Sequence, residues 1–149
     1  MKGLKLLTIV AVGLFCLTGC GEKTLECTLT EEDEDMKMVQ TMSLTFKDDQ
    51  VTNVKMSIDT TVKSENAQEN WSDFVDMMES QYEKTDADGV KVTTEEDADN
   101  YSFNLTVEAD VTKASEEALA EYDLDGLADN AGTYEENKEE AEANGFVCK

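Results

Sequence analysis

Strict alternation of apolar and polar residues constrains the fold of this chain more than any other feature of its sequence. Between positions 101 and 109 every second residue is apolar: Tyr101, Phe103, Leu105, Val107 and Ala109. Because successive side chains of a β-strand point to opposite faces, this period predicts a strand with one buried face. The same period recurs over residues 36–46, with Gln40 as the polar exception, and over residues 54–58.

These alternating segments group into two units. Residues 25–59 predict a three-stranded antiparallel meander, and residues 89–110 predict a hairpin around a polar turn at 95–100. Between the two units the apolar period becomes helical, and one helix face collects Ala67, Trp71, Phe74, Val75, Met78 and Tyr82. With Ser64 as its N-cap, this stretch predicts one long amphipathic helix packed on a face of the sheet.

The last forty residues predict shorter helices. One spans residues 115–122, and another runs from the capping box formed by Thr133 and Glu136 to about residue 144. Strands, a helix, a hairpin and then helices follow one another without β-α-β alternation. We therefore expect an α+β fold with a mostly antiparallel sheet.

The first twenty residues indicate export. Lys2 and Lys5 precede an apolar run over residues 6–17, which is too short for a transmembrane helix and typical of a secretory signal. The Leu-Thr-Gly-Cys sequence ending at Cys20 resembles a bacterial lipobox. This resemblance implies cleavage before Cys20 and a diacylglycerol on its sulfur, with two acyl chains for stable anchoring. The alternative is an ordinary signal peptide with a chance cysteine.

The expected organisation is a signal peptide over residues 1–19, a lipid-anchored tether over 20–24 and one domain over 25–149. So short a tether reaches only about 15–20 Å when extended. We therefore expect the domain close to the extracytoplasmic face of the cell membrane.

Charge and composition exclude several classes of function. The 149 residues carry a net charge of −23, and they include no histidine and no arginine. Nucleic-acid binding is disfavoured because its affinity comes largely from cationic side chains on phosphates. Histidine-dependent catalysis and histidine-ligated zinc are excluded. We expect no enzyme and no cofactor; the alternatives are an enzyme that uses only carboxylates and a protein that binds a divalent cation.

Two cysteines remain in the expected domain, Cys27 and Cys148. An even pair outside the cytoplasm is typical of a disulfide. Two free thiols and a metal site are the alternatives, although two cysteines without histidine make a poor zinc site.

A family resemblance extends over the mature chain. The sequence resembles the YehR-like bacterial lipoproteins, which have no established function, at the lipobox, Cys27-Thr28, residues 44–54, Tyr82, Gly89-Val90 and residues 145–149. The resemblance implies the same location and supports pairing Cys27 with Cys148. It implies no catalytic residues.

Five consecutive acids form the most prominent local motif: Glu31, Glu32, Asp33, Glu34 and Asp35. Carboxylates are ligands for a hard cation such as Ca²⁺, and they also attract a cationic protein or peptide. The more favoured interpretation is a solvated loop.

Three methionines share the inward parity of the second expected strand: Met36, Met38 and Met42. Thioethers are ligands for Cu(I), but methionines that alternate with Leu44 and Phe46 are more typical of a core. Trp71 and its aromatic neighbours are likewise assigned to the core rather than to a ligand groove.

Together these features predict a lipid-anchored extracytoplasmic lipoprotein that acts as a binding or envelope-accessory module. Its expected partners are the membrane, through Cys20, and a cationic protein or peptide.

Overall fold

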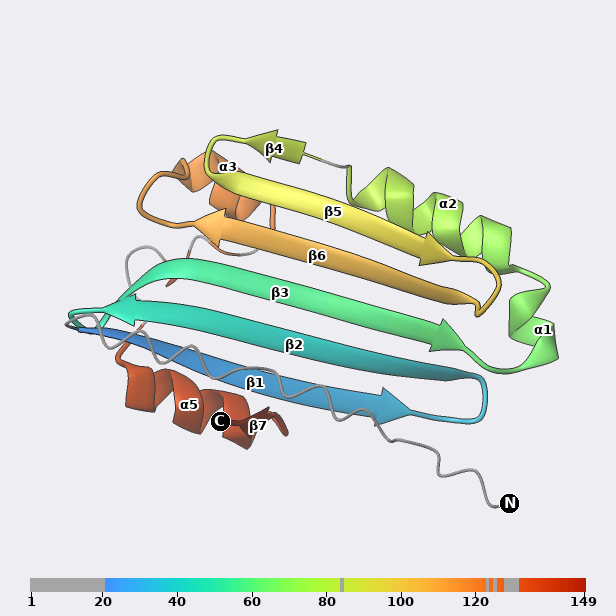
Figure 1. The fold of residues 1–149 in the computed structure, drawn as a ribbon, viewed down its shortest axis with the longest axis horizontal. Coiled ribbons are helices and arrows are strands. Elements are labelled where there is room, and N and C mark those ends of the chain that lie inside the picture. The colour runs from blue at the N-terminus through green and yellow to red at the C-terminus, as the bar shows by residue number, and fades with distance from the viewer. Residues whose placement is uncertain (1–20, 84, 123, 125, 128–131) are drawn as a thin grey trace, which may run out of the picture.

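The computed structural model describes residues 21–83, 85–122, 124, 126–127 and 132–149. One seven-stranded sheet has the order β4-β5-β6-β3-β2-β1-β7 (Figure 1). Its strands are β1 (Glu22–Glu32), β2 (Met36–Lys47), β3 (Gln50–Val62), β4 (Thr85–Ala87), β5 (Val90–Asp97), β6 (Ser102–Asp110) and β7 (Val147–Cys148). Helices in the described residues are α1 (Glu65–Gln68), α2 (Trp71–Gln81), α3 (Glu116–Ala120) and α5 (Tyr134–Ala143).

The α+β class and the antiparallel sheet predicted from the sequence are confirmed. Strands β1, β2 and β3 pair as a meander, and β5 and β6 pair as a hairpin. β6 joins these units by pairing antiparallel with β3. At the β2–β3 turn, Asp48 and Asp49 have φ of 52° and 61°, as two-residue hairpin turns with matching twist require.

The first strand begins earlier than the alternation indicates. β1 starts at Glu22, so residues 22–24 lie in the sheet although they were expected in the tether. Lys23 and Thr24 are paired with Phe46 and Thr45 of β2. The long second strand therefore supplies backbone partners for residues whose own side chains carry no apolar pattern.

The prediction of a single long helix between the meander and the hairpin is wrong, because this segment forms two shorter helices, α1 and α2. Near the break between α1 and α2, side-chain amides donate hydrogen bonds to backbone carbonyls. Asn70 Nδ2 donates to the Asn66 carbonyl at 3.1 Å, and Gln68 Nε2 donates to the Val62 carbonyl at 3.3 Å. Such local bonds compete with continuation of a helix. None of the helices in the described residues is long and apolar enough to cross a membrane.

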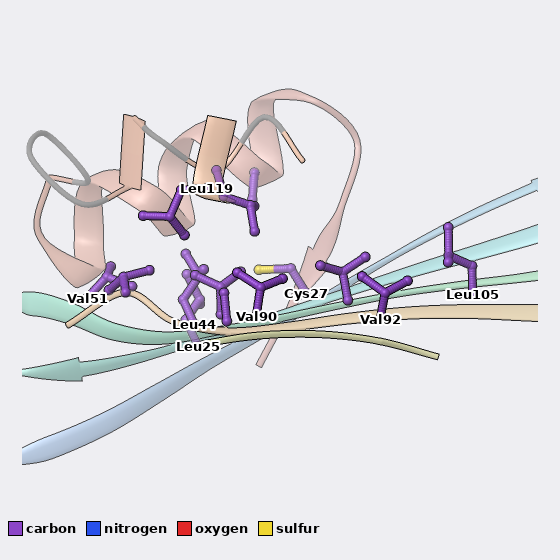
Figure 2. Packing of buried hydrophobic residues seen from close by; sticks show 14 of the residues in the cluster. Leu25, Cys27, Leu44, Val51, Val90, Val92, Leu105 and Leu119 are labelled. Atoms are coloured by element: carbon purple, nitrogen blue, oxygen red, sulfur yellow. The ribbon is translucent and has the colours of Figure 1, made fainter. Parts of the chain in front are cut away.

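The core lies on the side of the sheet that carries the helices. Figure 2 shows side chains such as Leu25, Leu44 and Val90 projecting from the strands toward the helices, with Leu119 facing them. The register aligns one buried row across five strands, in the order Leu25, Leu44, Val54, Ala109 and Val90. The strand alternation in the sequence therefore encodes this packed face.

The opposite face of the sheet is polar. A row of hydroxyl groups crosses the same five strands, formed by Thr28, Thr41, Ser57, Thr106 and Thr93. Asn104 Nδ2 donates to Ser57 Oγ at 2.9 Å and to Asp59 Oδ1 at 2.7 Å. Every described element and every described core residue lies within residues 21–149, so this fragment contains the folding unit.

Candidate functional site

The helices cover their side of the sheet unevenly. α2 packs over β6, where the ring centroids of Phe74 and Phe103 lie 6.1 Å apart. α5 packs over β2, where the rings of Tyr134 and Phe46 lie 5.6 Å apart. Between these contacts, three large side chains of β2 and β3 stay only half-buried: Met42, Met56 and Ile58.

A groove of about 390 Å³ lies over the central strands. Four apolar side chains line it from the sheet, because the β3–β6 register sets Met56 opposite Val107 and Ile58 opposite Leu105. Its other lining residues lie at the C-terminal ends of α2 and α3: Gln81, Tyr82, Glu121 and Tyr122. We call this site, defined by these eight residues, the apolar groove.

The apolar surface continues into β2. Met42 lies opposite Met56, and Gln40 lies opposite Ile58. Gln40 Nε2 is 3.8 Å from the Met38 sulfur, so the surface changes from apolar to polar at this position. In the sequence, Gln40 is the polar exception in the alternating pattern of β2, and it indicates that the inward face of this strand is not covered along its full length.

Acidic side chains dominate the electrostatics of the apolar groove. Burial raises the pKa of the Tyr122 phenol, and the carboxylates of Glu121 and Glu83 raise it further. The phenol is therefore neutral at physiological pH. Four lysines of the long strands lie on the other, polar face by parity: Lys37, Lys47, Lys55 and Lys91. Lys23 of β1 lies on the helix side but beside α5, with its Nζ 5.8 Å from the centroid of the Tyr134 ring.

The acidic run forms the end of β1 and the β1–β2 turn. Asp33 Oδ1 accepts bonds from the backbone N–H groups of Met36 and Asp35, at 2.8 and 2.9 Å, and these bonds lower the Asp33 pKa. Glu32 Oε1 lies 3.1 Å from Lys63 Nζ, which also donates to the Asp33 carbonyl. In the part of the chain that the structure describes, no three potential metal ligands gather, so Glu31–Asp35 are not brought together as a ligand set.

Cys27 and Cys148 form a disulfide in the structure. They are directly opposite each other in the β1–β7 pair, and the Lys149 N–H donates to the Glu26 carbonyl at 2.9 Å. Cys27 is fully buried, so the disulfide ties the C-terminal segment to the core. The lipid-attachment residue Cys20 lies outside the described residues.

The core interpretation is correct for Trp71, which is buried, and Met42 packs against the core. It is wrong for Met36, which is 36% exposed because it lies at the hairpin end of β2. The sequence reasoning missed the apolar groove because it assigned the inward residues of every strand to a covered core.

Neither a protein-family model nor a curated protein matches this chain. Among solved structures, the fold is similar to the NMR structure of the protein from Streptococcus pneumoniae TIGR4, with a TM-score of 0.55. The two sequences are 13% identical, and the match covers 100% of this chain and 97% of that chain. At this identity the similarity shows the fold alone.

Proposed function

We propose that this protein is a lipid-anchored lipoprotein on the extracytoplasmic face of the cell membrane, of the YehR-like kind, and that it acts as a binding module rather than an enzyme. The apolar groove is the observation that carries the binding role. Its floor of Met56, Ile58, Leu105 and Val107 is apolar, and a few polar side chains surround it. Ligand sites commonly combine these features.

The position of β1 supports the anchored arrangement. Only Gly21 separates Cys20 from the first residue of β1, so a lipid on Cys20 would hold one end of the sheet at the membrane. A strand rises about 3.3 Å per residue, which carries the chain roughly 35 Å along β1. The acidic turn between β1 and β2 would then face away from the membrane, and the β2–β3 turn would face toward it.

Replacement of the lipid-attachment cysteine tests the anchor. In the full chain expressed in a bacterium, Cys20→Ala should abolish incorporation of labelled palmitate and release the protein from the membrane fraction. The measurement is carbonate extraction followed by immunoblotting. Cys16→Ala is the matched control, because it removes a cysteine of the same N-terminal segment and should leave both readouts unchanged. Palmitate labelling and tight membrane association of Cys20→Ala would refute the proposed anchor.

A further inference from the structure

The floor of the apolar groove can adapt to a partner. Met56 lies opposite Met42 on one side and Val107 on the other, and both methionines are half-buried. Methionine is unbranched and polarisable, so it fills irregular gaps and is common at surfaces that accept apolar side chains. Ile58 and Leu105 extend this surface along the strands.

The apolar surface formed by the groove floor and the adjoining Met42 has the width of one helix. Met42, Met56 and Val107 lie on three neighbouring strands. Neighbouring strands are about 4.8 Å apart, so the three side chains span about 10 Å. An α-helix with its side chains is about 10–12 Å in diameter. An amphipathic helix laid into a groove is a recurring mode of peptide recognition.

Charge selects the sign of the partner. In the described part of the chain, the lining of the apolar groove includes the carboxylate of Glu121 and no lysine. Glu83 also acts on Tyr122, which lies in the same lining. The chain as a whole carries a net charge of −23. Such a surface attracts cationic partners and repels acidic ones.

From these three observations we infer that the apolar groove binds a cationic amphipathic helix of a partner protein. The apolar face of that helix lies on the groove floor and on the adjoining Met42, and its lysine or arginine side chains approach Glu121. This inference rests on the proposed binding role and names its partner class.

A synthetic peptide tests the inference on the fragment 21–149, which contains every described element and the described core. The probe is a fluorescein-labelled peptide of Leu and Lys, about 14 residues long, with its leucines on one helical face. A scrambled peptide has the same composition and charge without that face, and a third peptide replaces Lys with Glu. Fluorescence anisotropy should show saturable binding of the amphipathic Leu/Lys peptide that weakens as salt rises. Both other peptides should bind at least about tenfold more weakly.

Variants then locate the site. Met56→Gln should weaken binding about tenfold, because the probe loses apolar contact at the centre of the floor. Glu121→Lys, at an exposed position, should weaken binding and flatten its salt dependence. Thr41→Gln is the matched control, since Thr41 is half-buried on the polar face next to Met42, and it should change nothing. Thermal melts establish whether each variant is folded. If Met56→Gln does not fold, Glu121→Lys alone locates the site.

Four results would overturn the inference. Equal binding of the scrambled peptide would mean that the probe is attracted by net charge alone. Unchanged binding of the amphipathic Leu/Lys peptide to folded groove variants would mean that it binds elsewhere on the protein. Self-association that is abolished by the groove variants would assign the groove to a second copy of the chain. Groove-dependent binding of the Leu/Glu peptide would refute the cationic class but retain the binding role. Palmitate labelling of the full chain reports on the anchor independently of all these outcomes.

Discussion

Asp110 shows how a single carboxylate orders the turn that follows β6. Its Oδ2 accepts from Lys113 Nζ at 2.6 Å, and its Oδ1 accepts from the Thr112 hydroxyl at 2.5 Å and the Thr112 N–H at 3.1 Å. The bond from Lys113, followed by that from the Thr112 hydroxyl, lowers the pKa of Asp110. Three donors therefore hold the charged form at the point where the sheet ends.

Asp110→Asn should lower the free energy of unfolding at pH 7 by about 1 kcal/mol, a value reduced by solvent screening of the exposed Lys113. Because the folded pKa is depressed, the stabilisation is present above the unfolded pKa and is lost as pH falls through the folded pKa. The difference between wild type and variant should therefore shrink as pH falls through the depressed pKa of Asp110, as measured by urea unfolding at several pH values. Glu139→Gln removes an exposed charge on α5 and serves as the control. A difference for Asp110→Asn that persists undiminished in acid would exclude this origin.

At the scale of elements, periodicity predicted the strands well and the helix poorly. Each long strand has one packed face, so its alternation records its environment directly. Ala67 and Trp71 are four residues apart, which is the spacing of one helix face, although the helix is interrupted between them and restarts after Asn70. The bonds that end α1 go to backbone carbonyls in and just after β3, and a linear pattern does not encode this contact.

The apolar groove was hidden from the sequence for a related reason. Alternation marks Met42, Met56 and Ile58 as inward-facing, but only the placement of the helices decides which inward residues are covered. The disulfide partners were predictable because only two cysteines remain after Cys20. Their direct opposition in β1 and β7 is a property of the folded sheet.

The C-terminal segment depends on the disulfide more than on its strand pairing. β7 contributes only two residues, Val147 and Cys148, to the sheet. Replacing both cysteines, as Cys27→Ala with Cys148→Ala, should lower the free energy of unfolding by about 2–5 kcal/mol. Amide hydrogen exchange should accelerate most in α5 and β7, because the rest of the sheet keeps its long pairings.

Two controls accompany this measurement. A reductant should reproduce the effect in wild type, and it should have no effect on the double variant. Unchanged protection of α5 in the double variant would show that packing alone, including that of Tyr134 on Phe46, holds this segment.

At the scale of the whole molecule, charge is arranged by face and by end. The polar face of the sheet mixes cations with acids, as in the ion pair of Lys55 with Glu108 at 2.7 Å. The helix side carries the apolar groove, with Glu121 as the charged residue of its lining, and five acids gather at the end of β1 and in the β1–β2 turn. With a net charge of −23, the molecule repels itself when it is compact. Added salt should therefore stabilise the folded protein. Comparing different cations then tests whether the acidic run binds one of them specifically.

Thermal melts of the fragment 21–149 in NaCl, MgCl₂ and CaCl₂ at matched ionic strength separate screening from a site. We expect Mg²⁺ and Ca²⁺ to raise the melting temperature equally, because screening depends on ionic strength and valence rather than on ligand geometry. The acidic run favours this outcome, since Lys63 already pairs with Glu32 and backbone N–H groups already bond to Asp33. A rise specific to Ca²⁺ would instead indicate binding to the folded state. If a variant with Glu31→Gln, Glu34→Gln and Asp35→Asn abolished that rise, the acidic run would be a calcium site rather than a solvated turn.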